Sequence, residues 1–201
     1  MNLKRCAWPG EDPLYLAYHD EEWGLPLHDD NHLFEMLVLE SMQSGLSWIT
    51  ILRKREAFRL AFHGFDPVRV AKFGPKEIEK LLSDPDIIRN RAKLEAAVAN
   101  ARAALRVQER YGSLDFFLWR VVDGRPVVNR WRNYREAPAK DSRSETLAKE
   151  CKKQGFRFIG PTVAYAFMQA VGMINDHEVT CFRYKQLTGE ENAGNAGNAE
   201  K

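Results

Sequence analysis

The sequence predicts an all-α fold, and three observations support this class. Apolar residues recur at helical spacing in most segments between residues 29 and 171. These segments begin at Ser, Asp or Pro and stop at Gly, which are residues preferred at helix ends. Hardly any stretch alternates between apolar and polar residues as a strand does. With 201 residues, 44% of them hydrophobic and 29% charged, the chain can form one globular domain or two small lobes that share a core.

Composition limits the classes of function. No apolar run approaches the roughly 20 residues that a membrane span requires, and the first residues, MNLKRCAWPGEDP, do not read as a signal peptide. Three cysteines at scattered positions argue against a disulfide framework and predict a reducing, cytoplasmic location. The formal net charge is only +2, so a nucleic-acid partner would have to be bound by a local basic patch.

The first 28 residues are expected to be irregular and are unusually rich in aromatic side chains. Four of these fall within 16 residues, namely Trp8, Tyr15, Tyr18 and Trp23. Rings at this density are not expected to lie over water, because large aromatic side chains gain most from packing. They either pack on the core or line a pocket, and the sequence alone leaves both alternatives open.

Two helices joined by a short turn are predicted next. The first covers residues 29–40, begins at an aspartate cap and ends at Glu40 in the apolar stretch VLESM. A buried Glu is rare unless it is paired or functional, so Glu40 is a candidate site residue, with a satisfied structural carboxylate as the alternative. Residues 43–46 form the turn, and Ser47 caps a second helix over residues 48–62.

The chain continues with short helices and a helical hairpin. Pro67 and Pro75 each suit the first turn of a short helix, where the missing N–H has no partner to lose. A tight turn at residues 84–86 then precedes a long helix that reaches about residue 105. Three cations follow this turn: Arg89, Arg91 and Lys93. A hairpin with free N–H groups and three cations predicts a phosphate clamp, although an ordinary solvated charged face is the alternative.

The second half of the chain is expected to alternate helices and loops. Ser113 caps a helix that ends near residue 123, and residues 124–143, with six cations, are read as a surface loop. A further helix ends at Gln154 and is stopped by Gly155. From about residue 187 the chain is poor in apolar residues and repeats Asn-Ala-Gly, so residues 187–201 are expected to be a disordered tail.

One more helix is predicted over residues 161–171, because Pro161 suits its first position and Gly172 can close it. Asn175 or Asp176 is expected to cap a new turn after it. Such a turn would place a histidine and a cysteine, four residues apart, on one helix face.

These two residues, His177 and Cys181, are candidate metal ligands. The other Cys/His pair of this kind is Cys6 and His19, at the opposite end of the chain. Together the four would make the Cys₂His₂ set that zinc prefers. The spacing is not that of a standard zinc knuckle, and packing roles for each Cys and His are the alternative.

With these residues placed, the sequence resembles the bacterial 3-methyladenine-DNA glycosylases of type I. The matching stretches are spread over roughly residues 5 to 184 and combine an aromatic N-terminal segment, E-x₂-Q-x-GLSW and a C-terminal NDH-x₃-C. They are RCAW (5–8), DPLYLAYHDEEWG (12–24), LFEMLVLES (33–41), QSGLSWITILRKRE (43–56), FDP (65–67), IIRNRAKLEA (87–96) and GFRFIGPTVAYAFMQAVGMINDHEVTC (155–181).

The resemblance implies a helix-hairpin-helix glycosylase fold in two helical lobes, within a single domain over residues 1–186. The implied partner is double-stranded DNA that contains 3-methyladenine, bound across the cleft by a chain expected to be a monomer and to meet no membrane. The family also implies one zinc ion per chain. Its ligands would be Cys6, His19, His177 and Cys181. Because four protein ligands leave no position for water, this zinc would be structural.

The resemblance also assigns roles in base recognition. Methylation at N3 gives adenine a positive charge and makes it a good leaving group, so its site needs electron-rich rings and an anion. Trp48 matches the residue that stacks on the flipped base, and Glu40 matches the carboxylate that accepts from the exocyclic amine. Gly45 and Leu46 would wedge into the stack that the base has left. The remaining wall would consist of Trp8, Tyr15, Tyr18 and Trp23.

Two features depart from the wider superfamily. The predicted hairpin turn at residues 84–86 contains no Gly, and no Asp follows it before Asp115 to assist bond cleavage. No lysine stands out as a Schiff-base nucleophile, so strand cleavage is not expected. The sequence therefore predicts a monofunctional glycosylase. A zinc-stabilised DNA-binding sensor of alkylated bases is the alternative, and a zinc hydrolase would need an open coordination position.

Overall fold

The computed structural model describes residues 3–189 and is mostly helical. The helices are α1 (Pro13–Glu21), α2 (Asp30–Gln43), α3 (Trp48–Ala61), α4 (Pro67–Val70), α5 (Pro75–Ser83), α6 (Arg91–Tyr111), α7 (Leu114–Trp119), α8 (Ser142–Gln154), α9 (Pro161–Ala170) and α10 (Phe182–Thr188). Two short strands, β1 (Val127–Val128) and β2 (Ile174–Asn175), pair in parallel, with Val127 opposite Ile174. The all-α prediction is therefore confirmed at the level of fold class.

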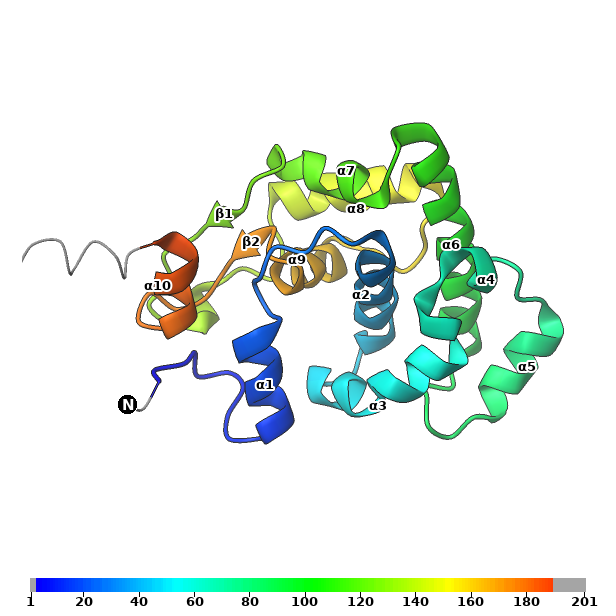
Figure 1. Cartoon of the computed structure of the whole chain (residues 1–201), viewed down its shortest axis with the longest axis horizontal. Helices are drawn as coiled ribbons and strands as arrows, with labels where there is room; N and C mark the ends of the chain where they lie inside the picture. The colour runs from blue at the N-terminus through cyan, green and yellow to red at the C-terminus, as the bar shows by residue number, and fades with distance from the viewer. Residues whose placement is uncertain (1–2, 190–201) are drawn as a thin grey trace, which may run out of the picture.

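Helix α2 lies at the centre of the molecule (Figure 1). Every residue from Leu33 to Met42 is buried, and the helix contacts α3, α6, α7 and α9. Its start follows from Asp29, whose carboxylate accepts a hydrogen bond from the backbone N–H of His32 at 2.8 Å. A helix that is buried on all sides has no solvent-facing stripe. The carboxyl groups of Glu35 and Glu40 are therefore carried into the interior.

Several predicted boundaries agree with the structure. Helices α4 and α5 begin at Pro67 and Pro75, and α9 begins at Pro161, as expected for proline in a first turn. Gly172 follows α9 with φ of +72°, and a Cβ there would lie 2.4 Å from the backbone carbon of Leu25. Only glycine fits this position, because both the backbone angle and the space exclude a side chain.

Two predictions of local structure were wrong. Residues 1–28 are not irregular throughout, because Asp12 caps α1 through hydrogen bonds from the N–H groups of Leu14 and Tyr15. Residues 177–181 form no helical turn, since the chain leaves β2 as a loop and α10 begins only at Phe182. Ser47 is the N-cap residue of α3, as predicted, but its hydroxyl contacts the side chain of Thr50 and makes no hydrogen bond to the helix backbone.

The two ends of the described chain lie side by side at one end of the molecule (Figure 1). The backbone N–H of Phe182 donates to the carbonyl of Lys4 at 2.8 Å, so the start of α10 is tied to the N-terminal segment. Of the predicted tail over residues 187–201, the first part completes α10, and residues 190–201 lie outside the described range.

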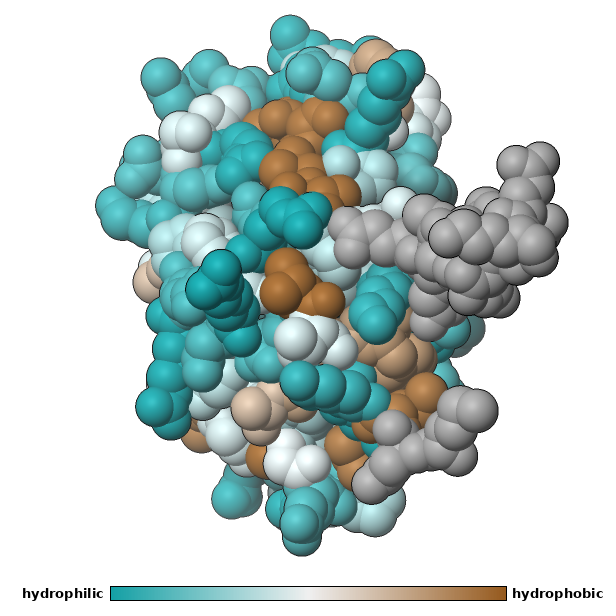
Figure 2. Space-filling view, turned by 90° about the vertical axis from the view of Figure 1, so that its left-hand side faces the viewer, coloured by the Kyte–Doolittle hydropathy of each residue, from teal (hydrophilic) through white to brown (hydrophobic). Residues whose placement is uncertain are grey.

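No helix between residues 3 and 189 is long and apolar enough to cross a membrane. Figure 2 shows the molecular face that carries α10, where apolar areas are separated by hydrophilic side chains.

Candidate functional site

A pocket of about 320 Å³ opens between α1, α2, α3 and the segment before α8. A cavity of this size is within the range that binds small molecules. Its lining residues are Trp8, Tyr15, Tyr18, Trp23, Glu40, Gln43, Trp48, Tyr134, Ala137, Pro138, Ala166, Gln169 and Asp176. All six residues that the sequence predicts for base recognition are among them, so the chain folds these distant segments around one cavity.

Aromatic rings form most of one side of this pocket. Trp8 packs edge-on against Tyr15 and Trp23, with ring centroids 4.9 Å and 5.0 Å apart. Tyr18 lies 5.4 Å from Trp48 across the junction between α1 and α3. Edge-to-face pairs of this kind hold each ring in a defined orientation. The pocket therefore presents rigid, electron-rich surfaces to a ligand.

Glu40 brings a carboxyl group to this aromatic wall. Its side chain is only 4% exposed, and burial raises its pKa from the usual 4.5 to about 8. One carboxyl oxygen, Oε2, is buried with no hydrogen-bond partner among the described residues, and the same is true of the indole N–H groups of Trp8 and Trp48. Unpaired buried polar atoms are costly, so the arrangement favours a ligand that supplies partners for them.

A second carboxylate, Asp176, also lines the pocket and was missed as a site residue by the sequence reasoning. It is 2% exposed and accepts four hydrogen bonds at 2.7–2.8 Å. The donors are the side chains of Asn129, Trp131, Tyr165 and Gln169. All four of these donors are neutral, so they solvate the carboxylate with dipoles. The sequence signal that could have identified Asp176 as a site residue was its position between Asn175 and the predicted metal ligand His177.

Residues 129–141 cross the rim of the pocket, although the sequence predicted only a surface loop there. Tyr134, Ala137 and Pro138 contribute to the lining. The segment is anchored where the backbone N–H of Tyr134 donates to Glu178 at 3.1 Å and where that of Val179 donates to the carbonyl of Trp131. The sequence reasoning interpreted this cation-rich region as a surface loop, and so it missed the contribution of the uncharged residues to the pocket.

The predicted DNA-binding residues lie outside the pocket. Leu46 is 40% exposed, beside Gly45 in the turn between α2 and α3. Arg89 is exposed before α6, and Arg91 pairs with Glu79 at 2.7 Å on the surface. Lys93 differs from the other two cations.

Lys93 is only 8% exposed, and its ammonium donates to the backbone carbonyls of Met42 and Ser44 at 2.9 Å and 2.7 Å. A buried ammonium held by two carbonyls is not available to bind phosphate. The position of Lys93 therefore does not fit the predicted phosphate role.

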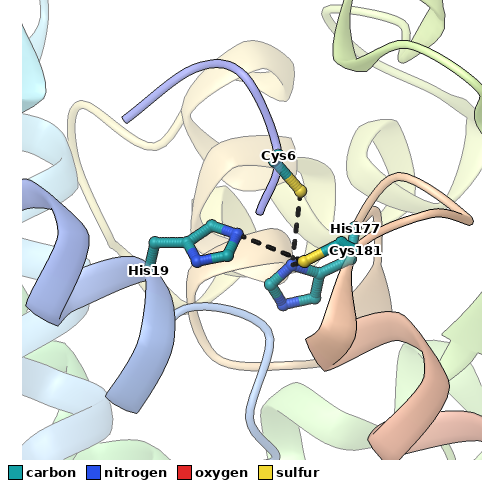
Figure 3. A group of neighbouring side chains, drawn as sticks. All are labelled: Cys6, His19, His177 and Cys181. Carbon is teal, nitrogen blue, oxygen red and sulfur yellow. Dashed lines mark hydrogen bonds between the residues drawn. The ribbon is translucent and has the colours of Figure 1, made fainter. Parts of the chain in front are cut away.

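The four predicted metal ligands form a second, buried cluster next to the pocket (Figure 3). Cys6 comes from the N-terminal segment, His19 from α1, and His177 and Cys181 from the loop before α10, and their potential ligand atoms all lie within 4.8 Å of one another. Close contact with the thiol of Cys6 and with the ring nitrogens of His177 and His19 lowers the pKa of Cys181. A group of this composition could hold one metal ion.

Neighbouring groups orient both histidines toward the cluster. Nδ1 of His19 lies 2.8 Å from the carboxylate of Asp20, which is itself held by Arg5. Nε2 of His177 lies 3.1 Å from the backbone carbonyl of Trp23. When each of these nitrogens donates its proton, the other ring nitrogen keeps its lone pair for the cluster. This outer support is typical of metal-binding histidines.

Comparisons with known proteins agree with this geometry. A family model described as methyladenine glycosylase matches residues 8–184. The chain is 47% identical over 182 residues to DNA-3-methyladenine glycosylase 1 of Escherichia coli (strain K12), which covers 90% of this chain and 97% of that protein. It is 46% identical over 177 residues to the DNA-3-methyladenine glycosylase of Haemophilus influenzae, with 88% and 96% covered.

Solved structures give the same result. A crystal structure of 3-methyladenine DNA glycosylase I superposes with a TM-score of 0.87 at 47% identity, covering 89% of this chain and 98% of that one. A tyrosine-to-phenylalanine variant of such an enzyme, solved in complex with 3-methyladenine, superposes with a TM-score of 0.86 at 39% identity, covering 89% and 96%. Taken with the pocket and the match over residues 8–184, these results establish that the chain belongs to the methyladenine glycosylase family.

Proposed function

We propose that this protein is a monofunctional DNA glycosylase that flips 3-methyladenine out of alkylated double-stranded DNA and hydrolyses its N-glycosidic bond. The observation that carries this proposal is the buried carboxyl group of Glu40 in an aromatic pocket, with one oxygen that has no hydrogen-bond partner in residues 3–189. The named relatives are DNA-3-methyladenine glycosylases, and one similar structure contains 3-methyladenine. The function is base excision repair of alkylation damage.

The pocket suits a cationic purine better than a neutral one. A cation over the face of Trp48 gains about 2 kcal/mol when the contact is desolvated. The ionised form of Glu40 accepts a hydrogen bond from the exocyclic amine, and the positive base offsets the cost of burying that anion. Unmodified adenine lacks the positive charge and so gains neither electrostatic term. Selectivity for the methylated base follows from this difference.

The reaction itself needs little chemistry from the protein. The bond between the sugar C1′ and the base nitrogen breaks, and its electron pair neutralises the positive charge of the base. Water then adds its oxygen to C1′ and loses a proton, which completes the hydrolysis. Positive charge develops on the sugar while the bond to the base breaks. A fixed carboxylate near the sugar therefore stabilises this charge. Asp176 is a candidate for this role because four donors hold it in place beside the pocket.

The metal that we propose for the Cys/His cluster is zinc. With bonds of about 2.3 Å to sulfur and about 2.05 Å to nitrogen, a tetrahedral zinc site has S···N edges of about 3.6 Å. The corresponding separations here are 3.5 Å for Cys6–His177, 3.6 Å for Cys181–His19 and 3.7 Å for Cys181–His177. Two cysteines and two histidines complete the coordination, so such a site ties chain segments together and takes no part in the reaction.

We place the DNA-binding hairpin of the superfamily at α8 and α9, and not at residues 84–93. These two helices pack against each other and are joined by residues 155–160, which begin and end with Gly. Gly155 closes α8 in the left-handed conformation, and the exposed Arg157 lines the same hollow as Gly160 and Pro161 at the start of α9, where a helix has free N–H groups. Glycines at both ends of the link are the feature that the 84–86 turn lacks.

The exposed Leu46 then occupies the place proposed for the wedge that fills the gap left by the flipped base. Because the pocket and the Cys/His cluster are both built from one chain, we propose that a monomer is the active unit.

The test is release of free base. Purified protein is incubated with duplex DNA that carries 3-methyladenine, and the supernatant is analysed for 3-methyladenine. We expect the base to be released and the DNA strand to remain intact until the abasic site is cleaved with alkali. Tight binding of the damaged duplex without release would support the alternative, a non-catalytic sensor of alkylated bases. Strand cleavage without alkali would contradict the monofunctional assignment.

A further inference from the structure

Helix α6 reaches two functional segments from a single face. Near its start, Lys93 donates to the carbonyls of Met42 and Ser44, at the end of α2. A helix leaves its last carbonyls without intrahelical partners, and its C-terminus carries partial negative charge. A buried ammonium satisfies both requirements at this position. Lys93 therefore fixes the point where the chain leaves α2 for the turn that carries Leu46.

Seven residues further along α6, Asn100 holds the α8–α9 hairpin. Its side chain is fully buried, its amide donates to the carbonyl of Arg157 at 3.1 Å, and its carbonyl accepts from the N–H of Arg157 at 2.7 Å. A separation of seven residues is close to two helical turns, so Lys93 and Asn100 project from the same side of α6, roughly 10 Å apart along its axis. One rigid helix thus contacts both segments.

We propose that Lys93 and Asn100 are positioning residues that hold the α2–α3 turn and the α8–α9 hairpin in fixed places relative to each other. The turn links Glu40 on α2 to Trp48 at the start of α3, so its geometry sets the spacing between the carboxylate and the stacking ring. The hairpin sets where the DNA backbone lies. The part that concerns Asn100 rests on the DNA-binding role proposed for the hairpin.

The turn depends on Lys93 because it has little support of its own. Within residues 43–47 the turn has its own backbone hydrogen bond from the N–H of Leu46 to the carbonyl of Gln43. Lys93 adds two bonds to the carbonyls on either side of Gln43. A displacement of about 1 Å at a reacting centre can reduce a rate about a hundredfold. Loosening the turn should therefore affect excision more than it affects the affinity for DNA.

The two residues should give opposite kinetic signatures. Lys93→Met removes the donors but keeps the length of the side chain. We expect its single-turnover excision rate at saturating DNA to fall roughly ten- to a hundredfold, with unchanged affinity and salt dependence on undamaged duplex. Asn100→Ala should instead weaken the binding of damaged and undamaged duplex alike, roughly tenfold, and leave the rate at saturation near that of the wild type. Lys93→Arg should recover part of the rate.

A matched control lies on the same helix. Arg102 also donates to two backbone carbonyls, those of Ala71 and Phe73, at 2.9 Å and 3.3 Å, but this segment does not line the pocket. Arg102→Met should lower thermal stability and leave both the excision rate and the DNA affinity unchanged. Hydrogen exchange of the peptide 43–48 gives a direct readout, and its protection should fall in Lys93→Met and not in Arg102→Met.

Three results would overturn the proposal. Lys93→Met that loses stability but excises at the wild-type rate would make Lys93 merely structural. A salt slope lower by about one unit would make it a phosphate ligand. If Arg102→Met lost as much excision rate as Lys93→Met, the contacts of Lys93 would have no specific role in excision. If Lys93→Met does not fold, Lys93→Gln replaces it, with a smaller loss of rate expected. Failure of the wild type itself to release base would refute the proposed function and not this inference.

Discussion

His177 and Trp23 link the Cys/His cluster to the aromatic pocket: Nε2 of His177 lies 3.1 Å from the backbone carbonyl of Trp23, whose ring lines the pocket. Two further members of the cluster are close in sequence to pocket-lining residues: Cys6 precedes Trp8 by two residues, and His19 follows Tyr18 directly. A metal ion bound by these four residues would therefore also fix part of the aromatic wall.

Removing a ligand should consequently affect both stability and base binding. We expect Cys181→Ala to lose about one zinc per chain and to unfold more easily, by about 4 kcal/mol or more where zinc exceeds its Kd a thousandfold. Its affinity for free 3-methyladenine should fall as well. Cys151→Ala is the matched control, because Cys151 is also buried but lies outside the cluster. Metal analysis, thermal denaturation and calorimetric titration with the base measure these effects; equal zinc content in both variants would refute the ligand assignment.

The pKa of Glu40 predicts how stability depends on pH. Burial raises this pKa from 4.5 in the unfolded chain to about 8 in the folded protein. Between these values the folded protein holds a proton that the unfolded chain has lost, so this group's contribution is greatest below about pH 4.5 and is lost as pH rises to about 8. Thermal denaturation at several pH values should show this loss in the wild type and not in Glu40→Gln. Parallel curves for the two proteins would show that Glu40 ionises normally.

The same pKa predicts a rising limb in the activity profile. The value of kcat/KM reports the ionisation of groups in the free enzyme, and the proposed recognition of a cationic base needs ionised Glu40. We expect kcat/KM on 3-methyladenine DNA to increase as pH rises toward about 8. Glu40→Gln should lack this limb. If kcat/KM of Glu40→Gln also rises with pH, with the same midpoint as the wild type, the titrating group is not Glu40.

The DNA-binding hairpin could lie at residues 155–160 or at residues 84–93. One pair of substitutions distinguishes these two placements. If residues 155–160 contact phosphate, Arg157→Ala should weaken binding of damaged and undamaged duplex alike and lower the salt slope by about one unit. Arg89→Ala is the counterpart in the hairpin predicted from sequence. It is similarly exposed and should have a smaller effect. Affinities are measured by fluorescence anisotropy over a salt series. A larger loss of affinity in Arg89→Ala than in Arg157→Ala would favour the hairpin predicted from sequence at residues 84–93.

Much of the fold could be predicted from local signals. Prolines in the first turn marked the starts of α4, α5 and α9, and Asp29 marked the start of α2. Such signals work because capping and proline geometry act within a few residues. Helix α1 was missed because four aromatic residues suggested a pocket wall, although Asp12-Pro13 is itself a good helix start.

The site was predictable in its composition and less so in its arrangement. Glu40 stood out because a carboxylate within an apolar helix is costly unless it has a role. Asp176 and Lys93 were misjudged because their partners lie far away in the sequence: Asn129 is 47 residues from Asp176, and Met42 is 51 residues from Lys93. Long-range hydrogen bonds leave no local pattern, so only the folded chain reveals them.

Glu40→Gln tests most directly whether ionised Glu40 recognises the cationic base, because the amide keeps the shape of the side chain and removes the charge. Hydrogen bonds to a charged partner are typically worth about 1.5–3 kcal/mol. At pH 8.5, where Glu40 is largely ionised in the empty pocket, both the affinity for free 3-methyladenine and the single-turnover excision rate should fall roughly ten- to a hundredfold. Affinity for undamaged duplex should not change. Unaltered base affinity with abolished turnover would show instead that Glu40 activates water, and no change in either would place base recognition elsewhere.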